Sequence, residues 1–401
     1  MRIALALVLA LTACSAPAAA RATASPAATA SASPAATTSA ATPSPEIALP
    51  YCSGTAPSDG TVRLCPDGVV LRIDRDIAPA DMAAIVAQVG EDLAWVQTEF
   101  RWTLRRPVPI DVYADRDRYA AGLASVFGYS GATADFVADN SVAFFEPSLV
   151  RIAVSWGAIR DRRPIAAIRH ELTHVVTLEA CTPRCDLVPA WLNEGEARLA
   201  EALVPGADWR MLRVRYEAAS MAATGTLFPL DRLITQAQWN ALADWDGYYK
   251  YQQAARAVAL LRDDIGDEAI ARLYAHIRAG DDVATAYARL AGRPFAGFVA
   301  SLPERLLGDA AAPGMVTITP GSDGHGVAFL VFGLPKDASA TLYWPGGSGV
   351  AEDLLVSPQG ASFLSLTAGD PPGIYTLRVT GSLTREFSFE KHGGRPAPRT
   401  P

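Results

Sequence analysis

The chain has 401 residues, of which 50% are apolar and 19% are charged. This balance is typical of globular protein and excludes a membrane protein with several spans, and the length is sufficient for two or three separate cores. The formal net charge of −7 gives no electrostatic argument for a nucleic-acid partner or for binding to an acidic membrane surface.

The N-terminus predicts export. Arg2 precedes an apolar run over residues 3–11, which is too short to span a bilayer and is typical of a signal peptide. Residues 11–14, Leu-Thr-Ala-Cys, resemble the bacterial lipobox, so residues 1–13 are expected to be removed and Cys14 to carry lipid. The lipid would anchor the protein to the cell membrane, facing the extracytoplasmic side. The alternative is an ordinary signal peptide that happens to contain a cysteine.

Residues 14–47 consist almost entirely of Ala, Ser, Thr and Pro, which predicts a disordered tether. The four remaining cysteines form an even set, which favours disulfides in an exported protein. Their proximity in sequence predicts the pairs Cys52–Cys65 and Cys181–Cys185. A metal site built from Cys181 and Cys185 is the alternative.

Residues 48–310 are expected to form an α+β domain whose N-terminal part is a small mixed α/β subdomain. Apolar residues recur with the period of a strand or of a helix in successive segments. The pattern predicts strands within 61–74, 108–113 and 141–156, and helices over 77–100 and 115–127.

Helical patterns dominate from residue 164 to about residue 307, which is the C-terminal part of the same domain. Two helices, over 164–180 and 189–204, carry the motifs described below. Further helices are predicted over 208–222, 236–264, 267–279 and 281–291.

In residues 313–391 the sequence pattern changes to short apolar strands separated by Gly and Pro turns. This pattern predicts an all-β immunoglobulin-like sandwich. Residues 392–401 are expected to be a tail.

His170-Glu171-Leu172-Thr173-His174 is an HExxH motif on the helix predicted over residues 164–180. Residues four apart share one helix face, so both imidazoles can bind one ion. Glu171 lies beside that face, where it can act as general base on a metal-bound water whose pKa a Zn²⁺ ion lowers to about 7. The alternative is a surface helix with two unrelated histidines.

A catalytic zinc of this kind needs a third protein ligand. The next predicted helix contains Trp191-Leu-Asn-Glu-Gly-Glu-Ala197, and HExxH followed by this segment resembles the gluzincin peptidases, aminopeptidase N among them, and the bacterial peptidase-MA-like proteins. The resemblance extends over roughly residues 60–310. It implies zinc as the metal and Glu194, directly before Gly195, as the third ligand. Glu196 is the rival, but two residues along a helix correspond to about 200° of rotation, so both carboxylates cannot face one ion.

Two features depart from this resemblance. Nineteen residues separate His174 from Glu194, one more than in aminopeptidase N, and the Cys181–Cys185 pair lies in that interval. A disulfide there would either stiffen the turn between the ligand helices or act as a plain loop staple. In addition, Arg198 occupies the position where thermolysin-like enzymes have an acidic partner for a ligand histidine.

Gluzincins often stabilise the oxyanion with a Tyr or His from the helices that follow. Residues 247–254, Gly-Tyr-Tyr-Lys-Tyr-Gln-Gln-Ala, resemble the Y-x-Q segment of peptidase-MA-like proteins. This resemblance selects Tyr251 as the residue that stabilises the oxyanion, and Tyr249 is the second candidate. The alternative is that these tyrosines only pack as half-buried aromatics. The strand region 141–156 could pair with extended substrate as an edge strand, or it could lie in the interior of the sheet.

The sequence as a whole predicts a zinc metallopeptidase that hydrolyses a peptide or protein substrate outside the cytoplasm. The expected metal ligands are His170, His174 and Glu194, and the expected catalytic residues are Glu171 and Tyr251. The alternative is a catalytically inactive surface binding or scaffold lipoprotein that uses the peptidase fold and the β-sandwich to recognise wall polymer or protein. The intact base favours the enzyme, because a scaffold needs none.

Overall fold

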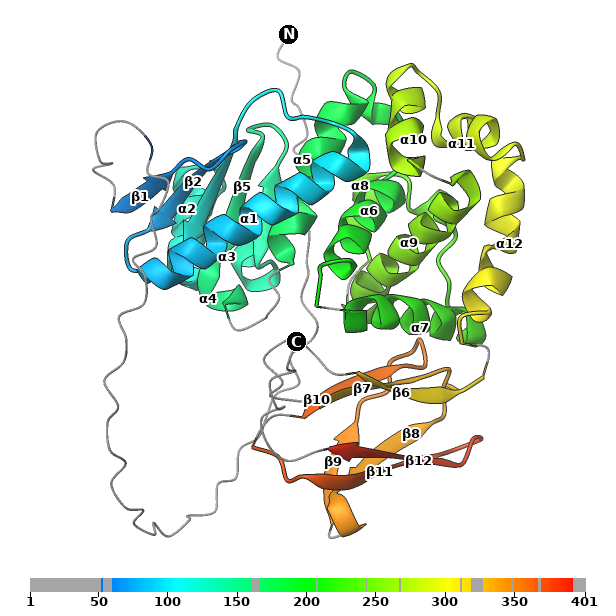
Figure 1. The fold of residues 1–401 in the computed structure, drawn as a ribbon. Helices are drawn as coiled ribbons and strands as arrows, with labels where there is room; N and C mark the ends of the chain where they lie inside the picture. Colours follow the sequence, from blue (N-terminus) through cyan, green and yellow to red (C-terminus); the bar gives the residue numbers. More distant parts are fainter. Residues whose placement is uncertain are drawn as a thin grey trace, which may run out of the picture.

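The computed structural model describes Cys52 and residues 60–391, apart from 161–165, 207, 243, 267, 311, 319–326, 348 and 367–368. These residues form a mixed sheet with helices on both faces, a group of helices, and two small antiparallel sheets (Figure 1). The expected signal peptide, the lipid-bearing Cys14, the tether and the tail lie outside the described residues. No helix in the described part of the chain is both long and apolar enough to cross a membrane.

The N-terminal part is built on a five-stranded sheet in the order β1-β2-β3-β5-β4. Its strands are β1 (Thr61–Leu64), β2 (Val69–Asp74), β3 (Val108–Tyr113), β4 (Ala143–Glu146) and β5 (Arg151–Ser155). The β2–β3 and β3–β5 pairs are parallel, and an antiparallel strand closes each side. The expected strands are confirmed, and β4 is an edge strand while β5 is interior.

Helices cover both faces of this sheet. Helices α1 (Pro79–Phe100) and α5 (Ala167–Cys181) share a core with one face, and α2 (Arg116–Ser125) and α3 (Gly131–Asn140) cover the other. The period of two in β4 sends Phe144 to the α2 and α3 side and Phe145 to the α5 side. The short α4 (Trp156–Ile159) follows β5 directly.

Helix α3 was not predicted from the sequence. It buries only Ala134 and Val137, and it contains Gly, Thr, Asp and Asn residues of low helix propensity. Its start is fixed by Ser130, whose side chain accepts a hydrogen bond from the backbone N–H of Thr133.

The C-terminal part of the expected domain is helical. It contains α6 (Ala190–Ala202), α7 (Asp208–Thr224), α8 (Gln236–Asn240), α9 (Asp244–Ile265), α10 (Ala269–Arg278), α11 (Val283–Ala291) and α12 (Phe295–Leu307), with 3₁₀ turns at Cys185–Leu187 and Leu230–Arg232. The single helix expected over 236–264 is wrong, because α8 ends at Asn240. The Nζ atom of Lys250 binds the carbonyl oxygens of Trp239 and Leu242 at this break, so side-chain bonds replace the helical ones.

Residues 314–391 form two antiparallel sheets in the orders β10-β7-β6 and β12-β11-β8-β9. Their strands are β6 (Gly314–Ile318), β7 (Val327–Phe332), β8 (Ser339–Tyr343), β9 (Val350–Leu354), β10 (Ser362–Leu366), β11 (Gly373–Thr380) and β12 (Arg385–Lys391). One core draws side chains from both sheets, including Phe329, Leu342 and Leu377, which is compatible with the expected sandwich. Strand β12 was not predicted, since charged residues stand at both of its ends.

The outer face of β7 packs on the helical part. Ala328, Leu330 and Phe332 form a buried cluster with Met221 of α7 and Tyr249 of α9. Figure 1 shows α7 lying between the helices and the two small sheets. Helices α7 and α9 are therefore packed against β7, and both also contact α6.

Candidate metal centre

Helix α5 brings the two histidines of the HExxH motif to one buried position. His170 and His174 are four residues apart and lie on one face, with ring centroids 4.9 Å apart. Their exposed fractions are 0% and 5%. Helix α5 is buried along most of its length, which fixes both rings.

Helix α6 packs beside α5 and presents Glu194 to both imidazoles. Its Oε2 atom lies 3.8 Å from Nε2 of His170 and 3.6 Å from Nε2 of His174. One ligand atom from each of the three residues lies within 4.8 Å of the others. The structure thus brings together the three residues predicted as metal ligands.

The facing atoms of this group fit a cation. Both Nε2 atoms and the Oε2 atom of Glu194 are buried and have no hydrogen-bond partner among the described residues. Such burial is costly unless a positive charge satisfies these atoms. Two imidazole nitrogens and one carboxylate oxygen can hold a metal ion, Zn²⁺ among others, and leave a coordination position open.

The pKa values of the group also favour positive charge between its members. Burial alone would lower the pKa of His174, but Glu194 outweighs it and raises the pKa to about 9. Burial would raise the pKa of Glu194, but His174 and His170 hold it below its usual value. A proton or a metal ion is therefore stabilised at this position.

The ring atoms of the histidines that face away from Glu194 meet acceptors that the sequence did not identify. Nδ1 of His174 lies 3.2 Å from Oδ1 of Asn193, and Nδ1 of His170 lies 3.6 Å from Oε2 of Glu201. Arg198 does not replace this acidic partner, since it forms an ion pair with Glu201 at 2.7 Å. Burial would raise the pKa of Glu201, but Arg198 and the other cationic groups around it hold it well below its usual range. Such partners orient ligand imidazoles.

Glu194 has its own support from α8. Nε2 of Gln236 donates to Oε1 of Glu194 at 3.2 Å, which leaves Oε2 directed at the histidines. Nothing in the spacing of the motif pointed to Gln236, because it lies 42 residues further along the chain.

The other acidic residues of the two motifs take different positions. Glu171 is buried, with an exposed fraction of 2%, and burial raises its pKa while His170 and His174 oppose the increase. Glu196 lies outside the three-residue group, and burial raises its pKa well above the usual value. The rotation of about 200° between Glu194 and Glu196 accounts for this separation.

The two candidate tyrosines of α9, Tyr249 and Tyr251, also lie in different surroundings. The Tyr251 ring lies 6.4 Å from the His170 ring and packs edge-on against Trp239 at 4.8 Å. The hydroxyl of Tyr249 instead accepts a hydrogen bond of 2.9 Å from Ser357, on the side of the two small sheets. Tyr251 is thus the member of the pair that lies beside the histidines.

A cavity of about 430 Å³ adjoins the ligand group. Its lining includes His174, Asn193 and Glu194, and Phe145 of the edge strand β4, whose ring stacks on His174 at 6.4 Å. A molecule in this cavity would reach the ligand group and the edge of the sheet at once.

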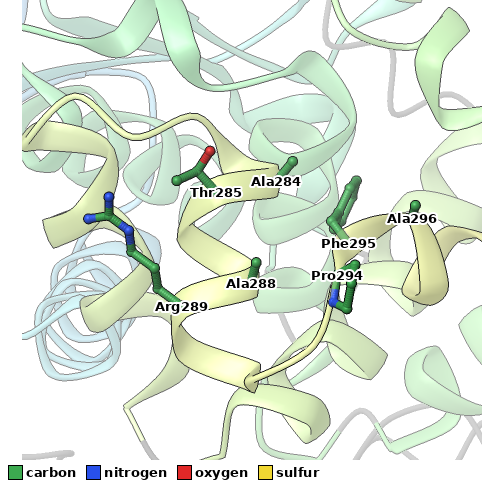
Figure 2. Close-up of a pocket in the computed structure, with 7 residues that line it drawn as sticks. All are labelled: Ala284, Thr285, Ala288, Arg289, Pro294, Phe295 and Ala296. Carbon is green, nitrogen blue, oxygen red and sulfur yellow. The ribbon is translucent and has the colours of Figure 1, made fainter.

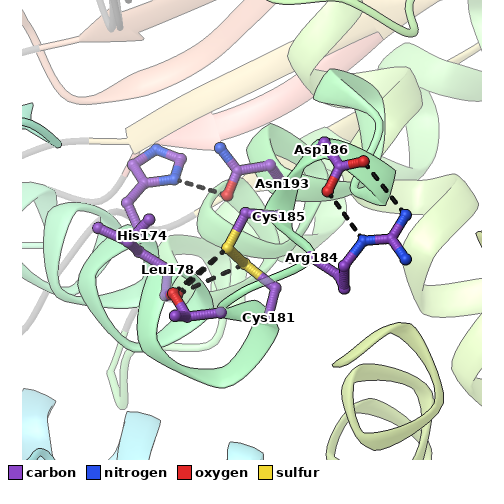
Figure 3. The surroundings of a disulfide bond; sticks show 8 residues. His174, Leu178, Cys181, Arg184, Cys185, Asp186 and Asn193 are labelled. Atoms are coloured by element: carbon purple, nitrogen blue, oxygen red, sulfur yellow. Dashed lines mark hydrogen bonds and ion pairs between the residues drawn. A yellow bond between two sulfur atoms is a disulfide. The ribbon is translucent and has the colours of Figure 1, made fainter. Parts of the chain in front are cut away.

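The expected disulfides are confirmed, since Cys52 is bonded to Cys65 and Cys181 to Cys185. The alternative metal site at Cys181 and Cys185 is therefore wrong. Figure 3 shows this disulfide next to the carbonyl oxygen of Leu178, with Asn193 and His174 nearby. Both cysteines line the 430 Å³ cavity, so the bond forms part of its wall.

Comparison with models of known protein families gives no match, and comparison with curated protein sequences gives no significant match. The functional argument therefore depends on the geometry of the site itself.

Proposed function

We propose that the chain is a zinc-dependent hydrolase of peptide bonds. The observation that carries this proposal is the buried group of His170, His174 and Glu194, whose ligand atoms face one another without other partners among the described residues. A carboxylate that follows the first histidine and a cavity beside the second are further support. The arrangement agrees with the resemblance to gluzincins, and we propose that residues 48–310 form a domain of that type.

The proposed zinc, when bound, supplies Lewis acidity to the scissile carbonyl and lowers the pKa of water. Glu171 accepts the proton of the attacking water and passes it to the leaving amine. The raised pKa of Glu171 brings its carboxylate closer to the range in which a group can both accept and donate a proton near neutral pH.

The remaining groups position the two imidazoles and the substrate, and stabilise the oxyanion. Asn193 and Glu201 hold the two imidazoles in the orientation that directs Nε2 toward Glu194. Tyr251, beside His170, donates a hydrogen bond to the oxyanion that develops on the carbonyl oxygen. The free edge of β4 pairs with an extended substrate, because β4 ends the sheet and Phe145 links it to His174.

The decisive experiment measures zinc per molecule in the purified protein and in three variants. We expect about one zinc in the wild type, loss of zinc in Glu194→Ala, and zinc with no hydrolysis of a peptide library in Glu171→Gln. Glu304→Ala, which removes an exposed glutamate far along the chain, is the matched control and should retain both properties. No zinc in any form, even after metal is supplied, would favour the inactive binding protein.

We also propose that residues 313–391 form an immunoglobulin-like sandwich and that Cys14 anchors the protein to the outer side of the cell membrane. The two antiparallel sheets with a shared core support the first statement, and the lipobox-like sequence supports the second. Replacement of Cys14 with Ser should release the protein from the membrane fraction.

A further inference from the structure

A second cavity, of about 420 Å³, adjoins the first one beside the metal centre. Asp186 and Ile234 line both cavities, so the two share a wall. The first cavity is the one lined by His174, Glu194 and the Cys181–Cys185 disulfide, and the second extends away from the ligand group toward α11 and α12.

The walls of the second cavity are mostly apolar. Trp191 of α6 and Phe295 of α12 stack with their rings 6.2 Å apart and nearly parallel, at an interplanar angle of 14°. Figure 2 shows Phe295 at the start of α12 beside Ala284 of α11. Val299, with an exposed fraction of 36%, adds further apolar surface that solvent can reach. A large apolar side chain placed here would cover surface that is otherwise in contact with water.

The wall that the two cavities share at Ile234, called the ridge below, is fixed to helix α6. The backbone N–H groups of Ala190 and Trp191, at the start of α6, donate to the carbonyl oxygens of Ile234 and Leu233 at 2.7 and 3.0 Å. Helix α6 also carries Glu194, so the ridge and the metal ligand belong to one rigid unit. Ile234 is half exposed on top of this ridge, with an exposed fraction of 49%.

The rim of the second cavity is acidic. Asp186, Asp231 and Asp282 line it, and no Lys or Arg does so among the described residues. Asp186 is paired with Arg184, and Asp282 accepts the backbone N–H of Thr285. Asp231 has no ion-pair partner in the described part of the chain. A cationic side chain of a ligand could therefore form an ion pair with Asp231.

We propose that the substrate is an extended polypeptide that runs from the metal centre across Ile234, and that the second cavity binds one of its large apolar side chains next to a Lys or Arg. This inference rests on the proposed function. It makes the protein an endopeptidase that recognises a residue remote from the bond it cleaves, because the occupant of the second cavity is separated from the ligand group by the ridge.

The test uses peptides of about twelve residues, which at about 3.3 Å per residue are long enough to cross both cavities. Each has an Ala, Gly and Ser background, one Phe moved along the chain, and Lys or Glu beside it. Binding to the zinc-loaded full chain carrying Glu171→Gln is measured by fluorescence anisotropy, so the readout is affinity and not turnover. Ala284→Trp is added to fill the second cavity, and Val299→Lys to make it polar.

Ala296→Trp is the matched control. Ala296 is exposed on α12 and lines the pocket of Figure 2 together with Ala284, but only Ala284 also lines the second cavity. We expect Ala284→Trp and Val299→Lys to weaken binding of the best Phe-Lys peptide about tenfold, while Ala296→Trp does not. We also expect Asp231→Lys to reverse the preference for Lys over Glu.

Equal binding by the Ala284→Trp and Ala296→Trp proteins, with circular dichroism showing both folded, would overturn the inference. If the wild type still hydrolyses peptides in that case, the proposed function stands without the second subsite. If the wild type neither binds zinc nor hydrolyses peptides, the same binding assay is run on the chain without zinc. Weaker binding by Ala284→Trp in that assay would mean that the proposed function is wrong and that the second cavity is part of a peptide-binding site.

Discussion

Gly195, the residue after Glu194, is a position where adding one methyl group should disturb the metal centre. A Cβ atom there would lie 2.8 Å from the carbonyl oxygen of Ala254 and 2.8 Å from Cγ2 of Val258, both on α9. Ordinary contacts of a Cβ atom begin at 3.4 Å, so α6 and α9 would have to separate by about 0.6 Å. Since one obstacle is backbone, a change of side-chain rotamer cannot relieve the contact.

The expected magnitude of the Gly195→Ala effect follows from two opposing terms. Overpacking of this kind costs about 1–3 kcal/mol, whereas replacing Gly by Ala inside a helix recovers about 0.5–1 kcal/mol. We expect a net loss of about 1–2 kcal/mol in the free energy of unfolding, equivalent to about 2–6 °C in melting temperature. Because Glu194 moves with α6, zinc affinity should also fall, by about tenfold.

Gly297→Ala is the control for this substitution. Gly297 also lies in a helix, α12, but a Cβ atom there would have no heavy atom within 4 Å. Thermal unfolding and zinc titration of both variants give the comparison, and Gly297→Ala should be as stable as the wild type or slightly more stable. A Gly195→Ala protein with unchanged melting temperature and zinc affinity would refute the argument that α6 and α9 need this contact.

Three further predictions concern the groups around the ligands. Asn193→Ala and Glu201→Gln should each weaken zinc binding about 10- to 100-fold while the three ligands remain, as a competition titration with a chelator would show. Tyr251→Phe should lower kcat about 100-fold with little change in KM, whereas Tyr249→Phe should lower the melting temperature and leave kcat unchanged. Burial lowers the pKa of Lys250 from 10.5 to about 8, so between these values the unfolded chain binds the extra proton and stability rises with pH. Denaturation at pH 7 and pH 10 should show the wild type gaining about 2–3 kcal/mol relative to Lys250→Met, and an equal response of both proteins would contradict this origin.

Hydrophobic periodicity predicted most of the fold because most elements bury one clear face. The strand at Val108–Tyr113 is confirmed with its expected bounds, since it is apolar and lies inside the sheet. The errors fall where local pattern and tertiary contact disagree. Residues 236–264 look like one amphipathic helix, but the buried Lys250 binds carbonyl groups at the break and fixes a second direction for the chain.

The candidate ligands were predictable because two of them share one helical turn and the third stands in a recognisable segment. The residues that support them were not. Asn193 and Glu201 were within reach, since Asn193 directly precedes Glu194 and Glu201 lies two turns beyond it on α6, but Gln236 approaches the site only through the packing of α8. The role of Gln236 is defined by which side chains the fold brings close, and spacing along the chain carries no such information.

One turn of α9 illustrates why tertiary packing had to decide between the tyrosines. Successive residues of a helix point about 100° apart, so residues 248–251 face four different surroundings. Tyr248 bonds to Glu217 of α7, and Tyr249 to Ser357 beyond the helices. Lys250 binds carbonyl groups at the end of α8, and Tyr251 lies against the ring of His170. The same turn therefore joins the neighbouring helices, the two small sheets and the candidate metal centre. A rotation of α9 large enough to bring Tyr249 to His170 would break all four contacts, so the packing of this turn places Tyr251, and not Tyr249, beside His170.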